Sequence, residues 1–187
     1  RRSDGYVGKP PELGSDCFAM ATAASAVPRY SSGFPVDFAF KRRPATTESW
    51  YTGARLLGKN RGYTDTDAAF SDNNTFIWDS NTHWPGGSGD DPNDYQAWMW
   101  KRHAGFDVVA FTGSSSEPGP SYAHGLGKIP ELKIIKRRNA SSTGWITTGT
   151  VVSQALAGNN NSKDYYLYLN TNAAATNFSN YWTGGND

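Results

Sequence analysis

The chain has 187 residues with a net charge of +1, and it contains 37% hydrophobic residues, seven Trp, ten Tyr, 20 Gly and one Cys. The balanced charge excludes the strong basic field of nucleic-acid-binding proteins, and no stretch approaches the roughly 20 apolar residues of a membrane-spanning helix. Cys17 alone forms neither an intrachain disulfide nor a cysteine-based zinc site. We therefore expect no nucleic-acid partner and no membrane insertion.

Short segments rich in β-branched and aromatic residues, separated by turn residues, predict strands along the chain, and no segment shows a helical stripe. Phe18–Ala26 is rich in Ala and without charge, so it fits a helix or an extended segment about equally well. The expected strands cover residues 36–41, 50–52, 75–78, 95–102, 106–112, 132–136, 144–148 and 165–169.

The expected strand at 95–102 has the clearest alternation between its two faces. Tyr95, Ala97 and Met99 are expected on one face, whereas Gln96, Trp98 and Trp100 are expected on the other.

An internal repeat runs through this series of strands. Ile129–Arg138 lies 95 residues after Phe34–Arg43 and repeats its Pro and its Lys-Arg-Arg end. Each segment also contains one acidic residue, Asp37 or Glu131, although the two are offset by one position in this alignment. Duplication of one β module explains an ordered set of matches better than the alternative, a chance similarity between two strands. The further matches are Trp50 and Thr52 with Trp145 and Thr147; Tyr63, Thr66, Ala68 and Ala69 with Tyr168, Thr171, Ala173 and Ala174, 105 residues later; and Trp84 with Trp182.

The two copies are not equally complete. After Trp84 the first copy continues through a Gly- and Asp-rich loop into the strand at 95–102, whereas the second copy stops within five residues of Trp182. The counterpart of the closing strand is missing, and we expect downstream sequence or a neighbouring chain to supply it. The sequence begins at Arg1 without an initiator Met or a signal peptide, which suggests a processed product or a piece of a longer chain.

An ordered series of landmarks carries a family resemblance. The landmarks are Gly105–Gly113, His124–Glu131, Lys136–Arg138, Gly144-Trp145 and Tyr168–Thr171 followed by Ala173–Ala175. The series resembles a repeat module of tail and fibre-like virion proteins of tailed bacteriophages, a family of uncharacterised function that is similar to concanavalin-A-like β-sandwich domains. The resemblance covers residues 104–182 well and 33–102 moderately, and residues 1–32 depart from it.

This resemblance implies an all-β fold of two tandem, related β-sandwich modules, concanavalin-A-like or jelly-roll-like, mostly antiparallel and with long loops. The expected domains are residues 1–103, of which 1–32 are divergent, and residues 104–187, which lack the closing strand. The landmarks are structural signatures, and they bring no catalytic residues with them.

The sequence contains no signature of a catalytic site. It lacks Gly-x-Ser-x-Gly, the P-loop, His-Glu-x-x-His and the Glu-x-Asp-x-x-Glu pattern of some concanavalin-like glycosidases, and His83, His103 and His124 are far apart. We expect no enzymatic activity; the alternative, a hydrolase, predicts a cleft with paired carboxylates.

The Gly- and Asp-rich loop offers one candidate metal site. Asp90, Asp91 and Asp94 supply the hard oxygen ligands that suit Ca²⁺, although their spacing matches no EF-hand. The alternative is a solvated loop of turn-forming residues. No other cofactor is expected.

The surplus of aromatic residues offers candidates for contacts with sugars or with protein partners. Because Trp50, Trp84, Trp145 and Trp182 recur between the copies, we expect them in the core or interface of the module. The basic ends Lys41–Arg43 and Lys136–Arg138 suggest phosphate binding or, as we prefer, solvated strand ends or salt bridges between subunits. The candidates for glycan or interface contacts are Trp78, Trp98, Trp100, Tyr122, Tyr181 and Trp182.

Together these features predict a non-enzymatic structural protein of a tailed-phage virion, from the tail, the fibre or the periphery of the baseplate. It would be assembled in the host cytoplasm as a homo-oligomer, by analogy with many fibres a trimer, against neighbouring virion proteins. One alternative is a lectin-like receptor-binding module for host surface glycans. Another is a capsid decoration or a surface-filament subunit.

Overall fold

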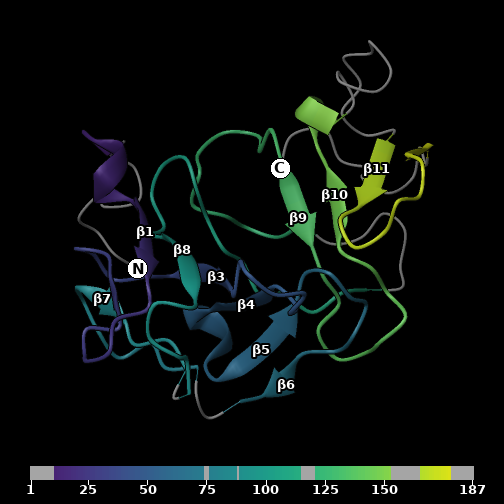
Figure 1. Cartoon of the computed structure of the whole chain (residues 1–187). Coiled ribbons are helices and arrows are strands. Elements are labelled where there is room, and N and C mark those ends of the chain that lie inside the picture. The colour runs from purple at the N-terminus through teal and green to yellow at the C-terminus, as the bar shows by residue number, and fades with distance from the viewer. Residues whose placement is uncertain (1–10, 74–75, 88, 115–120, 153–164, 178–187) are drawn as a thin grey trace. The chain divides into compact units, whose positions relative to one another are not determined.

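The computed structural model describes residues 11–73, 76–87, 89–114, 121–152 and 165–177. These residues form mostly antiparallel β-strands and loops (Figure 1), which confirms the all-β prediction. No helix in the described part of the chain has the length and apolarity needed to cross a bilayer. The chain divides into two compact units: the first comprises residues 1–63, 70–110 and 124–127, and the second comprises 64–69, 111–123 and 128–187.

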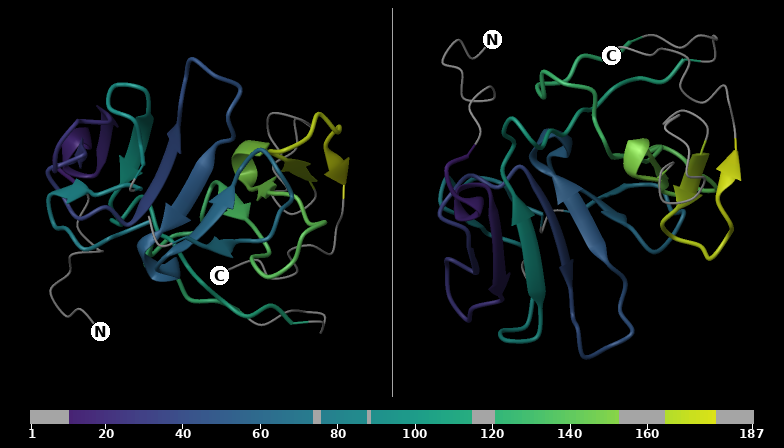
Figure 2. Two further views of the ribbon diagram at one scale, coloured as in Figure 1. Left: turned by 60° about the horizontal axis from the view of Figure 1, so that its bottom comes forward. Right: turned by 90° about the horizontal axis from the view of Figure 1, so that it is seen from above.

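The first unit is built around a six-stranded sheet in the order β1-β8-β3-β4-β5-β6. Figure 2 shows its strands side by side, although they come from distant parts of the sequence. A separate two-stranded ribbon pairs β2 (Tyr30–Ser31) with β7 (His83–Trp84). The sheet strands are β1 (Phe18–Thr22), β8 (Gln96–Trp100), β3 (Phe38–Arg42), β4 (Tyr51–Ala54), β5 (Asn60–Tyr63) and β6 (Ser71–Asp72).

Strand β8 has the two faces that its alternation predicts. Tyr95, which precedes it, and Ala97 and Met99 are 8%, 0% and 0% exposed, whereas Trp98 and Trp100 are half-buried on the opposite face. β1 pairs with β8 along its whole length, so the first five residues of the ambiguous segment Phe18–Ala26 form a strand and the remaining four do not.

The core of the first unit lies on the inner face of this sheet. Small residues there, among them Ala39, Ala97 and Gly53, leave room for large rings that loops and the ribbon bring over the sheet. These rings belong to Tyr30, Phe76, Trp78 and Trp84, all at most 5% exposed.

Two expected strands are wrong in the described residues. Phe76, Ile77 and Trp78 form no strand; Ile77 makes only an isolated bridge to Gly86, while residue 75 lies outside the described part. In the segment 106–112, only Phe106 pairs, in an isolated bridge to His103. Both segments have strand-like composition, but no neighbouring strand offers them a ladder of hydrogen bonds.

The second unit contains a four-stranded antiparallel sheet in the order β12-β11-β10-β9. Its strands are β9 (Lys133–Ile135), β10 (Ile146–Thr148), β11 (Tyr165–Tyr168) and β12 (Thr176–Asn177).

The sequence repeat corresponds strand for strand to two antiparallel meanders, β3-β4-β5-β6 and β9-β10-β11-β12. The pair Tyr51 and Tyr63 is repeated, after the two shifts, by Ile146 and Tyr168. The pair Asn60 and Asp72 is likewise repeated by Tyr165 and Asn177. Only the first pairing of each meander differs, and it differs by one residue: Ala39 pairs with Gly53, whereas Ile134 pairs with Thr147.

The meanders differ at their first strand. β3 is paired on its other side with β8, whereas β9, the counterpart of β3, is an edge strand within the described part of the chain. The expected tandem sandwich modules and their boundary between residues 103 and 104 remain predictions.

Candidate functional site

The Gly- and Asp-rich loop of the first unit directs one carboxylate into the protein. Asp90 is 7% exposed, and its Oδ1 forms an ion pair with Nζ of Lys41, which is 4% exposed. The Tyr30 hydroxyl donates to Asp90 Oδ2 at 2.7 Å, and the Gly87 N–H donates to the same oxygen at 3.3 Å. Arg29 Nη1 donates to the main-chain oxygen of Asp90, so every polar group of this residue that faces the interior is engaged.

Gly86 makes this approach possible. Its φ of +68° is in the left-handed region that glycine favours. A Cβ atom at this position would lie 2.4 Å from Cε2 of Tyr30 and 3.1 Å from Oδ2 of Asp90. A glycine is therefore required for the loop to turn over Tyr30 and bring the carboxylate to β3.

Aromatic rings surround the Lys41 ammonium group on its remaining sides. Its Nζ lies 5.6, 5.2 and 5.1 Å from the ring centroids of Tyr51, Phe76 and Tyr95. Burial lowers the pKa of Lys41, and Asp90 opposes that shift. Burial, assisted by Asp90, raises the pKa of Tyr30, so its hydroxyl remains a donor at neutral pH.

Asp91 and Asp94 face a different cation. Arg43 Nη2 lies 2.5 Å from Asp91 Oδ2, and Arg43 Nε lies 3.6 Å from Asp94 Oδ2. Glu48 completes this group: one oxygen lies 3.6 Å from Arg43 Nη1 and the other accepts from the Tyr95 hydroxyl at 2.8 Å.

These contacts correct the expectation of a Ca²⁺ site at Asp90, Asp91 and Asp94. The first carboxylate binds Lys41 and the other two bind Arg43, so the three do not converge on one point. In the ranges that the structure describes, no three His, Cys, Asp or Glu side chains form a group suited to a metal ion.

Of the basic strand ends, Arg137 and Arg138 are exposed, as expected of solvated residues, whereas the two lysines are not. Lys41 is buried, and Lys136, its counterpart in the repeat, donates from Nζ to the main-chain oxygens of Asp67, Arg137 and Thr143 at 2.8–3.0 Å. Burial lowers the pKa of Lys136 as well. Both lysines therefore bind oxygen atoms of the protein itself.

Trp78 is corrected as a candidate contact residue. It is 5% exposed, its ring stacks on Trp84 with 5.4 Å between centroids, and its Nε1 donates to the Gly58 oxygen at 2.8 Å. A side chain in this position cannot reach a sugar or a partner surface.

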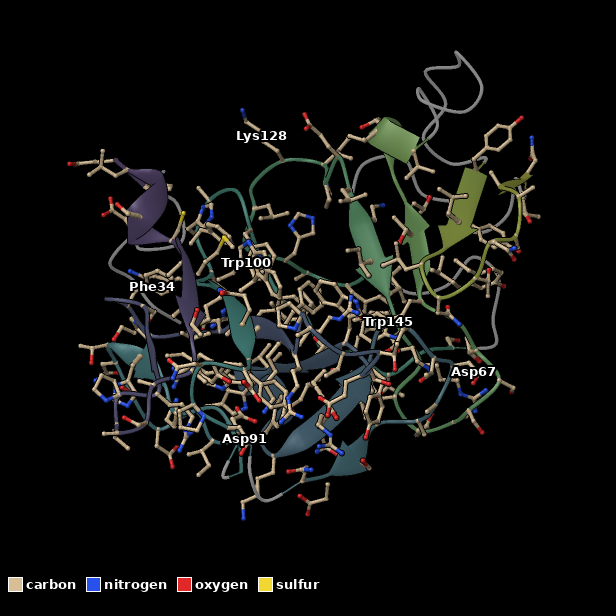
Figure 3. All side chains as sticks on the ribbon, in the orientation of Figure 1. Phe34, Asp67, Asp91, Trp100, Lys128 and Trp145 are labelled. Atoms are coloured by element: carbon tan, nitrogen blue, oxygen red, sulfur yellow. The ribbon has the colours of Figure 1, made fainter. Side chains whose placement is uncertain are left out.

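The other aromatic candidates do not form one group: two belong to the first unit, one belongs to the second, and two lie outside the described residues. Trp98 and Trp100 are on the outer face of the six-stranded sheet, and Figure 3 labels Trp100 there. Tyr122, in the second unit, packs on Phe111 with 4.1 Å between ring centroids and donates to the Thr112 oxygen at 2.5 Å. Tyr181 and Trp182 lie outside the described residues.

The recurring tryptophans follow the expectation only in part. Trp84 and Trp145 are 0% and 5% exposed, as expected of core residues. Trp50 is half-buried, and its ring lies 5.2 Å from that of Trp98, between centroids.

We define the outer aromatic face as Phe18, Met20, Phe38, Phe40, Trp50, Trp98 and Trp100. The strand register places these side chains together: Phe38 is opposite Trp100, while Phe40 and Met20 are both opposite Trp98. Their rings are in contact, for example Phe40 with Trp100 at 5.5 Å between centroids. Met20 is 55% exposed, and the others are half-buried. Such a surface is suited to packing or to stacking.

Sequence reasoning missed Lys41 and Tyr30 as partners of Asp90. The sequence marks the basic strand end and the Gly- and Asp-rich loop separately, but Lys41 and Asp90 are 49 residues apart and share no local pattern. No family model, curated protein or solved structure matches the chain.

Proposed function

We propose that the chain is a non-enzymatic structural module of a tailed-phage virion, from the tail, the fibre or the periphery of the baseplate. The resemblance of its repeated landmarks to virion repeat modules supports this function. The observation that carries it is that both copies of the repeat fold into the same meander, with equivalent residues paired.

The mode of action is assembly through two surfaces. One is the outer aromatic face of the first unit. The other is the edge of β9 that has no neighbouring strand in the described part of the chain; its counterpart β3 accepts β8 on that side in the other sheet. Exposed strand edges are templates for pairing with another chain. We propose that a strand from a following module or from a neighbouring copy pairs with β9; pairing with a neighbouring copy makes the chain part of an oligomer.

Location in the particle tests the virion function. Particles purified through a density gradient are digested, and peptides of this chain are quantified against those of the major capsid protein. We expect a fixed, low copy number that fractionates with detached tails. Enrichment with tail-less heads would favour capsid decoration instead, and absence from washed particles would contradict the proposal.

Strand pairing is tested by substituting Ile134, an exposed residue of β9. Ile134→Pro removes an amide donor from this edge strand, and Ile134→Val keeps the donor and the branched apolar side chain. We expect light scattering to show a loss of oligomer mass for the proline variant alone. Equal masses for the wild type and both variants would contradict pairing of β9 with a neighbouring copy.

A lectin-like function is the second proposal, and one feature of the outer aromatic face favours it. Trp50 and Trp98, whose rings are in contact at a tilt of 33°, are flanked by polar side chains. The Arg42 guanidinium lies 5.3 Å from the Trp50 ring centroid, and Gln96 lies next to Thr22 across the strands. Aromatic rings beside hydrogen-bonding groups suit a sugar, whose C–H face stacks while its hydroxyls bond.

Binding to host surface polysaccharide tests this second proposal. Trp98→Ala should abolish binding, while Met20→Ala, which removes an exposed apolar side chain from the same face without removing a ring, should retain it. If the unmodified chain binds no polysaccharide of its host, the lectin function is excluded and the structural function is unaffected.

A further inference from the structure

We propose that Lys41 and Asp90 form an intramolecular amide bond, which covalently joins strand β3 to the Gly- and Asp-rich loop of the first unit. The cross-link is a property of this unit and does not depend on the function proposed above.

The two reacting groups are held in contact away from water. Lys41 comes from the inner face of β3, Asp90 comes from the loop, and the two side chains are 5% and 6% exposed. Reactants that are held in a reactive orientation can reach effective molarities of about 10⁵–10⁸ M. Because Tyr51, Phe76 and Tyr95 surround the amine, it has few other orientations.

Burial makes the neutral, nucleophilic form of the lysine more accessible, although Asp90 opposes this effect. Burial lowers the pKa of Lys41, and a low-dielectric site penalises separated charges. Transfer of one proton from Nζ to the Asp90 carboxylate turns the ion pair into an amine and a carboxylic acid, which are the reactants of amide formation.

Two donors stabilise the charge that develops when the amine attacks. The Tyr30 hydroxyl and the Gly87 N–H both point at Asp90 Oδ2, at 2.7 and 3.3 Å. This oxygen becomes the oxyanion of the tetrahedral intermediate when Nζ adds to Cγ. The pair of donors therefore acts as an oxyanion hole for Asp90.

The step balances without an oxidant or a further reactant. Nζ of Lys41 attacks Cγ of Asp90 and a C–N bond forms. A second proton passes from Nζ to Oδ1, the Cγ–Oδ1 bond breaks, and one water molecule leaves. The nitrogen keeps one hydrogen, and the product is a neutral secondary amide.

Lys136 provides an internal contrast. It occupies the position of Lys41 in the repeat, but its Nζ bonds to main-chain amide oxygens, whose carbonyl carbons an amine does not attack under these conditions. The inferred chemistry therefore belongs to Lys41 only.

Mass spectrometry of the intact chain tests the cross-link. We expect a mass lower than the sequence mass by one water molecule, and a branched peptide joining Lys41 to Asp90 after proteolysis. Lys41→Arg and Asp90→Ala should have their full masses, whereas Lys136→Arg and Asp91→Ala should still lose water. A folded wild-type chain at full mass, or a water loss without the branched peptide, would overturn the proposal even if the variants fail to fold.

A second experiment tests the oxyanion hole. Tyr30→Phe keeps the ring and removes the donor, and its matched control is Tyr63→Phe, whose hydroxyl accepts from Arg61 Nη2 at 2.6 Å. The cross-linked fraction is followed by mass after cell-free synthesis. We expect Tyr30→Phe to slow cross-linking by roughly 10²-fold, with little change for Tyr63→Phe. Equal rates for the two variants would overturn the role of Tyr30.

Discussion

A Cβ atom added to Gly53 would lie 2.8 Å from Cδ1 of Phe76, so the ring rests on the sheet at a point where the chain has no side chain. Trp78 occupies the same region, with Cζ2 at 3.1 Å from that position. The first unit thus packs its largest rings onto its smallest residues.

Replacing Gly53 with Ala should therefore destabilise the first unit. Overpacking of a close-packed core costs about 1–3 kcal/mol, because the rings must leave their preferred positions. Urea unfolding followed by tryptophan fluorescence measures the loss. The matched control is Gly14→Ala, since a Cβ there meets nothing within 4 Å. Equal unfolding midpoints for the two variants would show that the rings are not fixed on the sheet.

Substitution by Ala should destabilise the chain more at Trp78 than at Trp98. Trp78 is 5% exposed among core rings, so its removal should cost about 3–5 kcal/mol of the free energy of unfolding. Trp98 is half-buried on the outer aromatic face, and its removal should cost clearly less. Thermal unfolding of both variants measures the difference. A larger loss for Trp98→Ala would contradict the assignment of the two faces.

In the second unit, the Asn170 side chain accepts a hydrogen bond from the main chain at Trp145, next to β10. Asn170 Oδ1 accepts from the Trp145 N–H at 2.9 Å, and Asp65 occupies the equivalent position in the first copy. Asn170→Ala should cost about 1–3 kcal/mol, because it leaves that N–H without its acceptor. Asn170→Asp keeps an acceptor and should cost less.

Amide hydrogen exchange at Trp145 reports this bond directly. We expect faster exchange in Asn170→Ala and near-normal exchange in Asn170→Asp, with the exposed Asn172→Ala as the control. Unchanged protection in Asn170→Ala would show that the bond does not hold the strand.

His103 should make the turn that follows β8 sensitive to acid. Burial, with a smaller effect of the Lys101 charge, lowers the pKa of His103 below its usual 6.5, and Nδ1 accepts from the Gly105 N–H at 2.9 Å. Since the pKa is lower in the folded chain than in the unfolded one, the contribution to stability is fully present above pH 6.5. It is lost as the pH falls through the folded value.

Nuclear magnetic resonance titration of the His103 ring protons measures that pKa, and we expect a midpoint below 6.5. His103→Gln keeps a side-chain acceptor for the Gly105 amide and should remove the dependence of stability on pH in this range. A midpoint at or above the usual value would contradict the prediction.

The recurring residues show why the repeat is readable in the sequence. Thr66 Oγ1 accepts from the Ala68 N–H at 3.3 Å, and Thr171 Oγ1 accepts from the Ala173 N–H at the same distance. In each turn a Thr hydroxyl accepts from the N–H two residues later. Because both copies form this turn, both have a Thr at the same position.

The sequence by itself determined the elements whose pattern is local. The two faces of β8 follow from alternation along five residues, and the two meanders follow from a repeat that can be aligned residue by residue. The sequence does not determine which strand-like segments find a partner: Phe106–Thr112 has the composition of a strand but forms no ladder.

Only the tertiary structure decided which partners the charged side chains of the loop have and which tryptophans are buried. Asp90, Asp91 and Asp94 look alike in the sequence, yet Asp90 is buried against Lys41 while the others meet Arg43. Trp78 and Trp98 are equally aromatic, yet one lies in the core and the other on the outer aromatic face. In each case the deciding partner is far away in the chain, because burial and charge pairing depend on which distant segments the fold brings together.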